Sequence, residues 1–270
     1  MDIQRHAIGF SAFAIFLVFA PGCPKREATN TIAKPSRTGT SIGSTDAAKL
    51  DAGPAALHDP AHPPIDCPLH KQGIHPDHLR PFEDTAKYIA FLERPDRAVW
   101  QKPDAVVANL GLTGNETVAD VGAGPGYFAF RIAHALPKGK VIALDVDPEM
   151  IRHLHHKAMT NGVHNLEAVF AKPDDPGVPA DTDLVFLCDV LHHIADQPAW
   201  LAKLATTLKK GARLTLVEFK PWKLPEGPPE AIKLSRAQLV ALATNAGFVL
   251  ESEHAHLLPY QTFLIFRKPL

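Results

Sequence analysis

The sequence predicts a doubly wound α/β domain with a mostly parallel sheet. From residue 116 onward, short apolar runs alternate with longer amphipathic segments, as expected when each strand is followed by a helix. The run Leu184–Leu187 is apolar throughout, which is typical of a central strand covered on both faces. Two final runs, Val249–His256 and Tyr260–Arg267, meet at Pro259 and predict a hairpin that adds an antiparallel edge.

Helices are expected before this region. In Phe82–Leu92, apolar residues recur at helical spacing, and the Arg94-Pro95 pair is expected to end that helix. Asp104 is expected to cap a second helix that contains Val106 and Leu110. We therefore assign residues 67–103 to an N-terminal helical lid that crosses the mouth of the domain behind it.

The first half of the domain is expected to hold three strands and two helices. Thr117–Val121 predicts a strand that ends at glycines, and Tyr127–Leu136 predicts the helix after it. Val141–Leu144 is the second predicted strand. Pro148–Thr160 follows as a helix with proline at its start, a position where its missing N–H is not needed. Leu166–Phe170 is the third predicted strand.

The second half continues the alternation after the central apolar strand. Trp200–Leu208 predicts a helix that Gly211 closes, and Arg213–Phe219 predicts the fifth strand. Ser235 and Gln238 form a capping box for a helix that ends near residue 247. With the C-terminal hairpin, residues 104–270 are expected to form a seven-stranded, mostly parallel sheet preceded by N-terminal helices.

The first 23 residues have the pattern of an export signal. Arg5 precedes the apolar stretch Ala7–Ala20, which is shorter than the roughly 20 residues that span a bilayer. Small residues and then Cys23 follow, which resembles a bacterial lipoprotein signal whose cysteine is lipidated, although Ala20 and Pro21 depart from that pattern. We expect an exported lipoprotein anchored to the bacterial envelope. The alternatives are an ordinary signal peptide, an uncleaved anchor, or a cytoplasmic protein whose signal does not function.

Residues 24–66 are expected to be a disordered linker. The run Thr29–Lys49 contains scarcely any large apolar side chain and cannot bury enough surface to offset the entropy of ordering. Cys67, His70, His75 and His78 follow at a spacing that zinc tolerates, but only one thiol is present and Pro and Asp interrupt the pattern. We therefore predict no metal site.

Composition limits the class of partner. Hydrophobic residues make up 46% of the 270 residues and charged residues 21%, as in ordinary globular proteins. The formal net charge is -1, so no basic surplus exists for nucleic acid, whose binding depends on neutralising phosphates. The three cysteines cannot form a disulfide framework. A small-molecule partner is favoured, and the oligomeric state is left open.

The central motif is Asp120-Val-Gly122-Ala-Gly124-Pro-Gly126, at the end of the first predicted strand. Glycines there allow a sharp turn and a close approach of the backbone to a ligand. Dinucleotide-binding loops place a third glycine at the position held here by Tyr127. The carboxylate of Asp120 would repel a pyrophosphate but attract a cation. Asp145 ends the next strand, where an acid suits ribose hydroxyls. The pattern indicates a nucleoside with a cationic tail.

These motifs resemble class I S-adenosylmethionine-dependent methyltransferases of the small-molecule type. The glycine motif is followed by Leu-Asp145-Val-Asp147-Pro-x-Met150, and residues 183–194 and 211–218 resemble the fourth-strand and fifth-strand motifs. The resemblance covers about residues 104–268. It implies the Rossmann-like fold and S-adenosyl-L-methionine as the cofactor, and the cofactor-binding residues that it implies are Asp120, Gly122, Ala123, Gly124, Gly126, Asp145, Val146, Met150 and Asp189.

The resemblance implies methyl transfer to a small-molecule acceptor by in-line displacement. The protein's main task in such a reaction is to position donor and nucleophile, so a catalytic dyad is not required. If the acceptor needs a general base, His192 or His193 is the nearest candidate, since histidine titrates near neutrality. We see no Asn/Asp-Pro-Pro-Tyr sequence of the kind found in many nucleic-acid amino-methylases.

Two other functions stay open at this point. S-adenosylmethionine is made in the cytosol, whereas the signal predicts export. A non-catalytic, membrane-tethered module that binds a nucleoside or a metal on the same fold is therefore the alternative. A dehydrogenase is a third possibility, and it would bind a nicotinamide dinucleotide instead.

Overall fold

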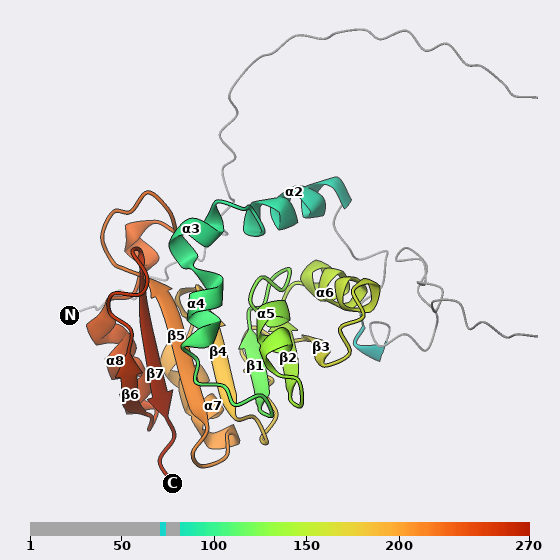
Figure 1. The fold of residues 1–270 in the computed structure, drawn as a ribbon. Coiled ribbons are helices and arrows are strands. Elements are labelled where there is room, and N and C mark those ends of the chain that lie inside the picture. The colour runs from blue at the N-terminus through green and yellow to red at the C-terminus, as the bar shows by residue number, and fades with distance from the viewer. Residues whose placement is uncertain (1–70, 74–81) are drawn as a thin grey trace, which may run out of the picture. The chain divides into compact units, whose positions relative to one another are not determined.

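A seven-stranded sheet forms the centre of the protein (Figure 1). The computed structural model describes residues 71–73 and 82–270, which belong to one unit of the chain, Ala52–Leu270. The strand order is β3-β2-β1-β4-β5-β7-β6. The first five strands are parallel, β7 is antiparallel to β5, and β6 is antiparallel to β7. This confirms the predicted fold class, with strands β1 Thr117–Val121, β2 Lys140–Asp145, β3 Leu166–Phe170, β4 Leu184–Cys188, β5 Arg213–Phe219, β6 Val249–Glu253 and β7 Gln261–Arg267.

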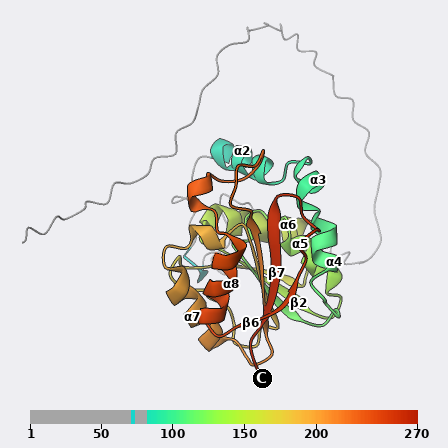
Figure 2. The same ribbon diagram turned by 90° about the vertical axis from the view of Figure 1, so that its left-hand side faces the viewer.

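Helices cover both faces of the sheet, as Figure 2 shows edge-on. Alternate strand residues point to opposite faces, so Val118 and Phe186 enter one hydrophobic cluster, while Ala119 and Leu187 enter the other. The central strands are therefore buried on both sides, as their apolar sequences predict. The first face carries α4 Pro103–Ala108, α5 Ala129–Ala135 and α6 Pro148–Thr160, and the second carries α7 Gln197–Thr207 and α8 Arg236–Asn245.

Two helices lie across the carboxyl end of the parallel strands (Figure 1). The first, α2 Phe82–Leu92, has the predicted bounds, and the second is the five-residue α3 Arg97–Gln101, which was not predicted. The prediction that Asp104 caps the next helix is wrong. Lys102 is the N-cap of α4, and Asp104 lies in the first turn, where its carboxylate pairs with Arg131 at 3.1 Å.

Helix caps explain the other boundaries. The capping box of Ser235 and Gln238 is present at the start of α8. Helix α7 begins three residues before the predicted Trp200, because Asp196 caps it by accepting a hydrogen bond from the amide of Ala199. The prediction that Gly211 closes α7 is wrong: the helix ends at Thr207, and Gly211 has a φ of +79° in the turn that leads to β5.

The remaining sequence predictions concern the N-terminal part. Residues 1–23, the linker 24–66 and the candidate metal ligands Cys67, His70, His75 and His78 lie outside the described residues. Gln72 is described, and its side-chain amide pairs with the edge strand β3 through the carbonyl of Ala168 at 3.2 Å and the amide of Phe170 at 2.6 Å. None of the described helices combines the length and the hydrophobicity that a bilayer crossing requires.

Candidate cofactor and acceptor site

A cavity of about 450 Å³ opens at the carboxyl ends of β1 to β4, where open α/β sheets bind ligands. Its walls come from the segments that follow four neighbouring strands. Gly122 and Val146 come from the loops after β1 and β2, and Lys172 comes from the segment after β3. His193 and Trp200 come from the segment after β4 and the start of α7. The four loops thus enclose a space suited to one small ligand.

Asp145 ends β2 and lines this cavity. Each of its carboxylate oxygens accepts a backbone hydrogen bond: Oδ2 from the amide of Gly124 at 2.8 Å and Oδ1 from the amide of Asp147 at 2.9 Å. Burial raises the pKa of Asp145, and the two amides oppose that rise. A carboxylate offers about four acceptor positions, more than these amides use, so its oxygens can also accept from ligand hydroxyls. The carboxylate is therefore fixed in place before any ligand binds.

The glycine loop needs its glycines for steric reasons. Gly122 has a φ of +68°, and a Cβ there would lie 2.3 Å from Cγ2 of Val190. Gly126 has a φ of +92°, and its Cβ would lie 2.6 Å from side-chain atoms of Leu154 and Phe130. The amides of Gly122 and the adjacent Ala123 both donate to the carbonyl at the end of β2. This tight turn delays the start of α5 to Ala129, two residues beyond the predicted start.

Asp120 is buried at the end of β1, with 3% of its surface exposed. Its Oδ2 atom has no hydrogen-bond partner among the described residues. Burial and the neighbouring charge of Asp145 raise the pKa of Asp120 to about 8. An unpartnered buried carboxylate oxygen is costly unless a donor or cation meets it. Asp120 thus fits the predicted role of binding a cationic group.

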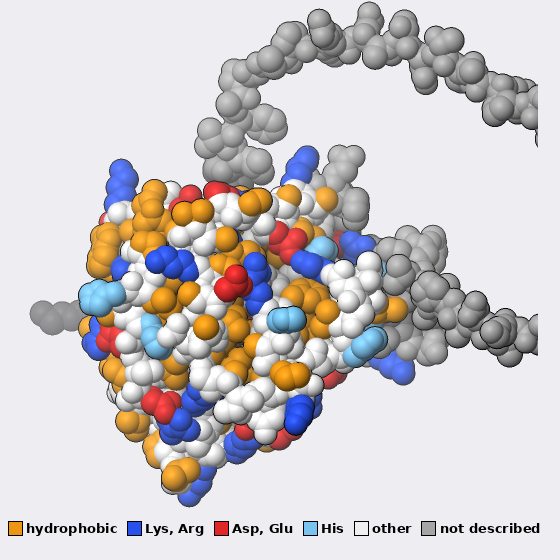
Figure 3. Space-filling view, in the orientation of Figure 1, with side chains coloured by type: hydrophobic (Ala, Val, Ile, Leu, Met, Phe, Trp, Pro, Cys, Tyr) orange, Lys and Arg blue, Asp and Glu red, His pale blue; other side chains and the backbone are white. Residues whose placement is uncertain are grey.

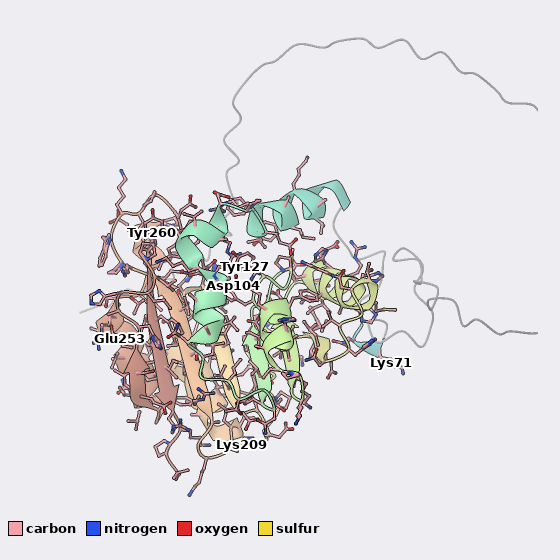
Figure 4. All side chains as sticks on the ribbon, in the orientation of Figure 1. Lys71, Asp104, Tyr127, Lys209, Glu253 and Tyr260 are labelled. Atoms are coloured by element: carbon pink, nitrogen blue, oxygen red, sulfur yellow. The ribbon has the colours of Figure 1, made fainter. Side chains whose placement is uncertain are left out.

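Helices α2 and α3 pack directly on the glycine loop. A Cβ on Gly124 would meet the side chain of Leu92, at the end of α2, at 3.7 Å. The guanidinium of Arg97 in α3 lies 4.2 Å from the ring centre of Tyr127, and Tyr127 lies at this end of the sheet (Figure 4). Both helices fall within residues 67–103, whose role as a lid stays a prediction. The sequence did not predict Arg97 as a residue beside the glycine loop.

Asp189 follows β4 and is held by two amide side chains. The Nε2 atom of Gln261 donates to both carboxylate oxygens at 2.8 Å, and the Nε2 atom of Gln101 donates to Oδ2 at 3.1 Å and to Sγ of Cys188 at 3.0 Å. Burial and the nearby charge of Glu218 raise the pKa of Asp189 to about 7. Its φ of +60° is uncommon outside glycine and shows that the surroundings fix this turn.

The two candidate bases, His192 and His193, have different surroundings. The side chain of His192 is 2% exposed, and its Nδ1 lies 2.7 Å from Oε2 of buried Glu218. The Oε1 atom of the same glutamate accepts from the amides of Val190 and Leu191. This arrangement gives His192 a structural role in holding the turn after β4. His193 instead lines the cavity, and burial together with its neighbour lowers its pKa.

The two predicted cofactor-binding residues after β2 differ in exposure and in position. Val146 is 51% exposed and lines the cavity. Met150 is only 2% exposed within α6 and is not part of the cavity wall. The structure therefore brings Gly122, Asp145, Val146 and His193 together around the cavity. It places Asp120 and Asp189 at the ends of adjacent strands, beside the lining residues Val121 and Val190. Within the described residues, no three His, Cys, Asp or Glu side chains gather as metal ligands.

Comparison with known proteins agrees with this geometry. Residues 119–214 match a family described as methyltransferase domain. The malonyl-[acyl-carrier protein] O-methyltransferase of Hahella chejuensis is 30% identical over 104 residues, which are 37% of this chain and 35% of that protein. The ubiquinone/menaquinone biosynthesis C-methyltransferase of Francisella tularensis subsp. novicida is 28% identical over 130 residues, 47% of this chain and 51% of that protein. The matches thus span well under two thirds of these relatives.

Solved structures share the fold. A SAM-dependent methyltransferase from Aquifex aeolicus superposes with a TM-score of 0.63 at 24% identity, covering 67% of this chain and 97% of that one. An O-methyltransferase from neocarzinostatin biosynthesis, in complex with S-adenosyl-L-homocysteine and 1,4-dihydroxy-2-naphthoic acid, gives a TM-score of 0.57 at 20% identity, covering 69% and 58%. These likenesses confirm the predicted Rossmann-like fold. Of the two proteins, the one from Aquifex aeolicus is described as SAM-dependent.

Proposed function

Because residues 119–214 match a methyltransferase-domain family, we propose that this chain transfers a methyl group from S-adenosylmethionine to a small-molecule acceptor. The observation that carries the proposal is the fixed carboxylate of Asp145 in the wall of a 450 Å³ cavity, next to the glycine loop. That pairing suits a ribose held against a closely approaching backbone.

The residues present fit the cofactor. The carboxylate oxygens of Asp145 can accept from the ribose hydroxyls, and Val146 and His193 line the cavity around it. Gly122 lets the backbone come close, since any side chain there would overlap Val190. The unpartnered Oδ2 of buried Asp120 matches an ammonium group.

In-line displacement is the proposed reaction. When bound, S-adenosylmethionine supplies a methyl group on a sulfonium, which is an excellent leaving group. The residues of this chain then have to exclude water and orient the acceptor, and such positioning can supply roughly 7 to 11 kcal/mol. Asp189, with both carboxylate oxygens held by the amides of Gln101 and Gln261, is the proposed acceptor-side group. If a base is needed, His193 is the proposed one, because His192 is tied to Glu218.

The acceptor is proposed as a small molecule on grounds of charge. On the face drawn in Figure 3 basic and acidic side chains are interspersed. Nothing on that face resembles the basic field that binds nucleic acid. One of the two relatives is named an O-methyltransferase and the other a C-methyltransferase, so their names do not favour oxygen over carbon as the acceptor atom.

Calorimetric titration with S-adenosylhomocysteine, the stable product, tests cofactor binding. We expect the wild type to bind, and Asp145→Ala to lose at least about tenfold in affinity because its ribose contacts are removed. The control is Glu253→Ala, at the far edge of the sheet, which should bind as the wild type does (Figure 4). A methyl-transfer assay with radiolabelled S-adenosylmethionine on extracts fractionated by acceptor class then identifies the product. Cofactor binding without transfer to any fraction would favour the non-catalytic nucleoside-binding module instead.

We also propose that residues 1–23 export the chain and that Cys23 carries a lipid anchor, with residues 24–66 as the linker to the domain. The proposal depends on the apolar stretch and the cysteine that follows it. Mass analysis of the mature N-terminus tests it. A diacylated or triacylated Cys23 supports export and anchoring, whereas an intact Met1 in a soluble fraction supports a cytoplasmic protein.

A further inference from the structure

An apolar surface lies at the end of the domain where the parallel strands finish. Helices α2 and α3 and residues 220–234, which lead from β5 toward α8, come together there in both ribbon views (Figures 1 and 2). Five of the ten exposed large apolar side chains among the described residues belong to these segments, and they form the apolar face: Tyr88, Phe91, Val99, Trp222 and Ile232. Soluble proteins rarely gather exposed apolar side chains at one end unless that end binds something.

Internal contacts hold the segments of the apolar face together. Arg94, which follows α2, forms an ion pair with Glu226, and its guanidinium lies 4.6 Å from the ring centre of Phe91. Buried Lys233 donates to the backbone carbonyl of Trp222 at 2.9 Å. The four prolines of residues 220–234 restrict the backbone further. The indole of Trp222 is thus 56% exposed on a backbone that is fixed in place.

The unpaired charges around the apolar face are more basic than acidic. Lys87 in α2 and Lys223 beside the exposed indole both reach solvent, and neither forms an ion pair with the described residues. The acids of these segments whose side chains are described are mostly paired with cations: Glu93 with Lys157, and Asp96 and Glu226 with Arg94, which leaves Glu230. Aromatic rings beside lysines are typical of a membrane interface, where the rings lie at the level of the headgroups and the lysines meet lipid phosphates.

We propose that the apolar face binds the surface of a bilayer that contains anionic phospholipids. The domain itself then contacts the membrane, in addition to the proposed lipid on Cys23. In this orientation the carboxyl end of the parallel strands, where the cavity opens, is turned toward the bilayer. The inference goes beyond the proposed function and does not depend on methyl transfer.

The chain that precedes α2 favours a bilayer over a protein as the partner. It contains the apolar stretch Ala7–Ala20 and Cys23, the proposed site of the lipid anchor. The residues between Cys23 and Phe82 span at most about 190 Å even when fully extended, so an anchored domain stays close to its membrane. Such a tether raises the local concentration, so an apolar face of modest area is enough for binding. Helix α2, which carries part of that face, begins directly after the tether.

The exposed indole of Trp222 reports on this contact. The other two tryptophans, Trp100 and Trp200, are buried, and the apolar stretch near the N-terminus contains none. The full chain with Cys23→Ser, which cannot be acylated at that position, is mixed with vesicles of phosphatidylcholine and phosphatidylglycerol whose acyl chains carry bromine. Bromine in the acyl chains quenches only an indole that enters the bilayer. The vesicle concentration at half-maximal quenching therefore measures binding of the apolar face.

We expect this parent chain to be quenched and Trp222→Phe to lose that signal. Phe91→Ser should need about tenfold more vesicles, because an exposed aromatic ring no longer enters the bilayer. Lys223→Glu should need at least about fivefold more, and the difference should shrink at high salt. The matched control is Val249→Ser, because Val249 is 58% exposed, as Phe91 is, but lies in the edge strand β6. It should bind as the parent chain does.

Three results would overturn the inference. The first is an unquenched Trp222, whether the chain stays in solution or sediments with the vesicles through its N-terminal part alone. The second is an equal loss of binding in Val249→Ser and Phe91→Ser. The third is a change in Trp222 emission with protein concentration in the absence of vesicles, which would place a second copy of the chain on the apolar face. None of these readouts needs the cofactor, so they leave the test of the proposed function separate.

Discussion

Cofactor affinity should fall steeply as the pH drops below 8, because of Asp120. Burial and the charge of Asp145 raise the pKa of Asp120 to about 8, so its carboxyl group is mostly protonated at neutral pH in the free protein. A cationic amino group needs the ionised carboxylate. Binding below pH 8 must therefore include release of the Asp120 proton, and the free energy of that ionisation is subtracted from the affinity.

The size of the effect follows from the pKa. One pH unit below the pKa corresponds to 1.36 kcal/mol, or about tenfold in affinity. Between pH 8 and pH 6 the dissociation constant of S-adenosylhomocysteine should increase about 50-fold, or about 2.3 kcal/mol. At pH 7 the protein should release about 0.9 proton for each ligand bound. The sign is fixed by the raised pKa: affinity is gained as the pH increases toward 8. Above pH 8 the gain ends, because the ligand's own amino group then begins to lose its proton.

Calorimetry at constant ionic strength from pH 6 to pH 9, in pairs of buffers with different ionisation enthalpies, measures both the affinity and the proton count. Asp120→Asn is the control, since its neutral amide has nearly the same shape as the protonated acid. This variant should bind weakly with little dependence on pH. A wild-type affinity that is flat between pH 6 and pH 8, or an Asp120→Asn variant with the same slope, would contradict the reasoning.

Three further predictions concern stability and are checked by denaturant unfolding. Gly122→Ala should lower the free energy of unfolding by about 2 to 4 kcal/mol, because its Cβ overlaps a neighbouring side chain. In the control Gly162→Ala, where φ is similar but the space is open, the free energy of unfolding should fall by about 1 kcal/mol. His192→Ala should cost about 3 kcal/mol by leaving Glu218 buried without its partner. Burial lowers the pKa of His192, but the contact with Glu218 outweighs burial and raises it. The stabilisation that the His192–Glu218 pair provides is therefore complete below pH 6.5 and declines as the pH rises through the raised pKa. Arg236→Ala removes an exposed ion pair and should cost less than about 1 kcal/mol. An Arg236→Ala variant that loses as much stability as Gly122→Ala or His192→Ala would refute these assignments.

The fold could be predicted because its signals are local. The strand Thr117–Val121 and the helix Pro148–Thr160 have the bounds that periodicity and helix-start signals predict. The position of Asp145 in the cavity wall could be predicted because the carboxyl ends of parallel strands lie at the ligand edge of a doubly wound sheet. Each of these conclusions needs only neighbouring residues and the general geometry of doubly wound sheets.

The contacts that complete the site depend on residues far apart in the sequence. Gln101 and Gln261 hold Asp189 across 88 and 72 residues, and no local pattern distinguishes these glutamines from surface ones. Helix α3, which carries Arg97, has five residues and is too short to show a hydrophobic period. His192 and His193 are neighbours in sequence, so only the fold decides which one pairs with Glu218 and which one lines the cavity.

The central claim is that the cavity binds an adenosine group through Asp145 with the glycine loop beside it. A crystal structure of the protein soaked with S-adenosylhomocysteine tests this most directly. The predicted result is density in the cavity with the ribose hydroxyls within hydrogen-bond distance of the Asp145 carboxylate and the amino-acid end toward Asp120. An empty cavity in that crystal, together with a nicotinamide dinucleotide whose pyrophosphate occupies the glycine loop in a parallel soak, would contradict the claim.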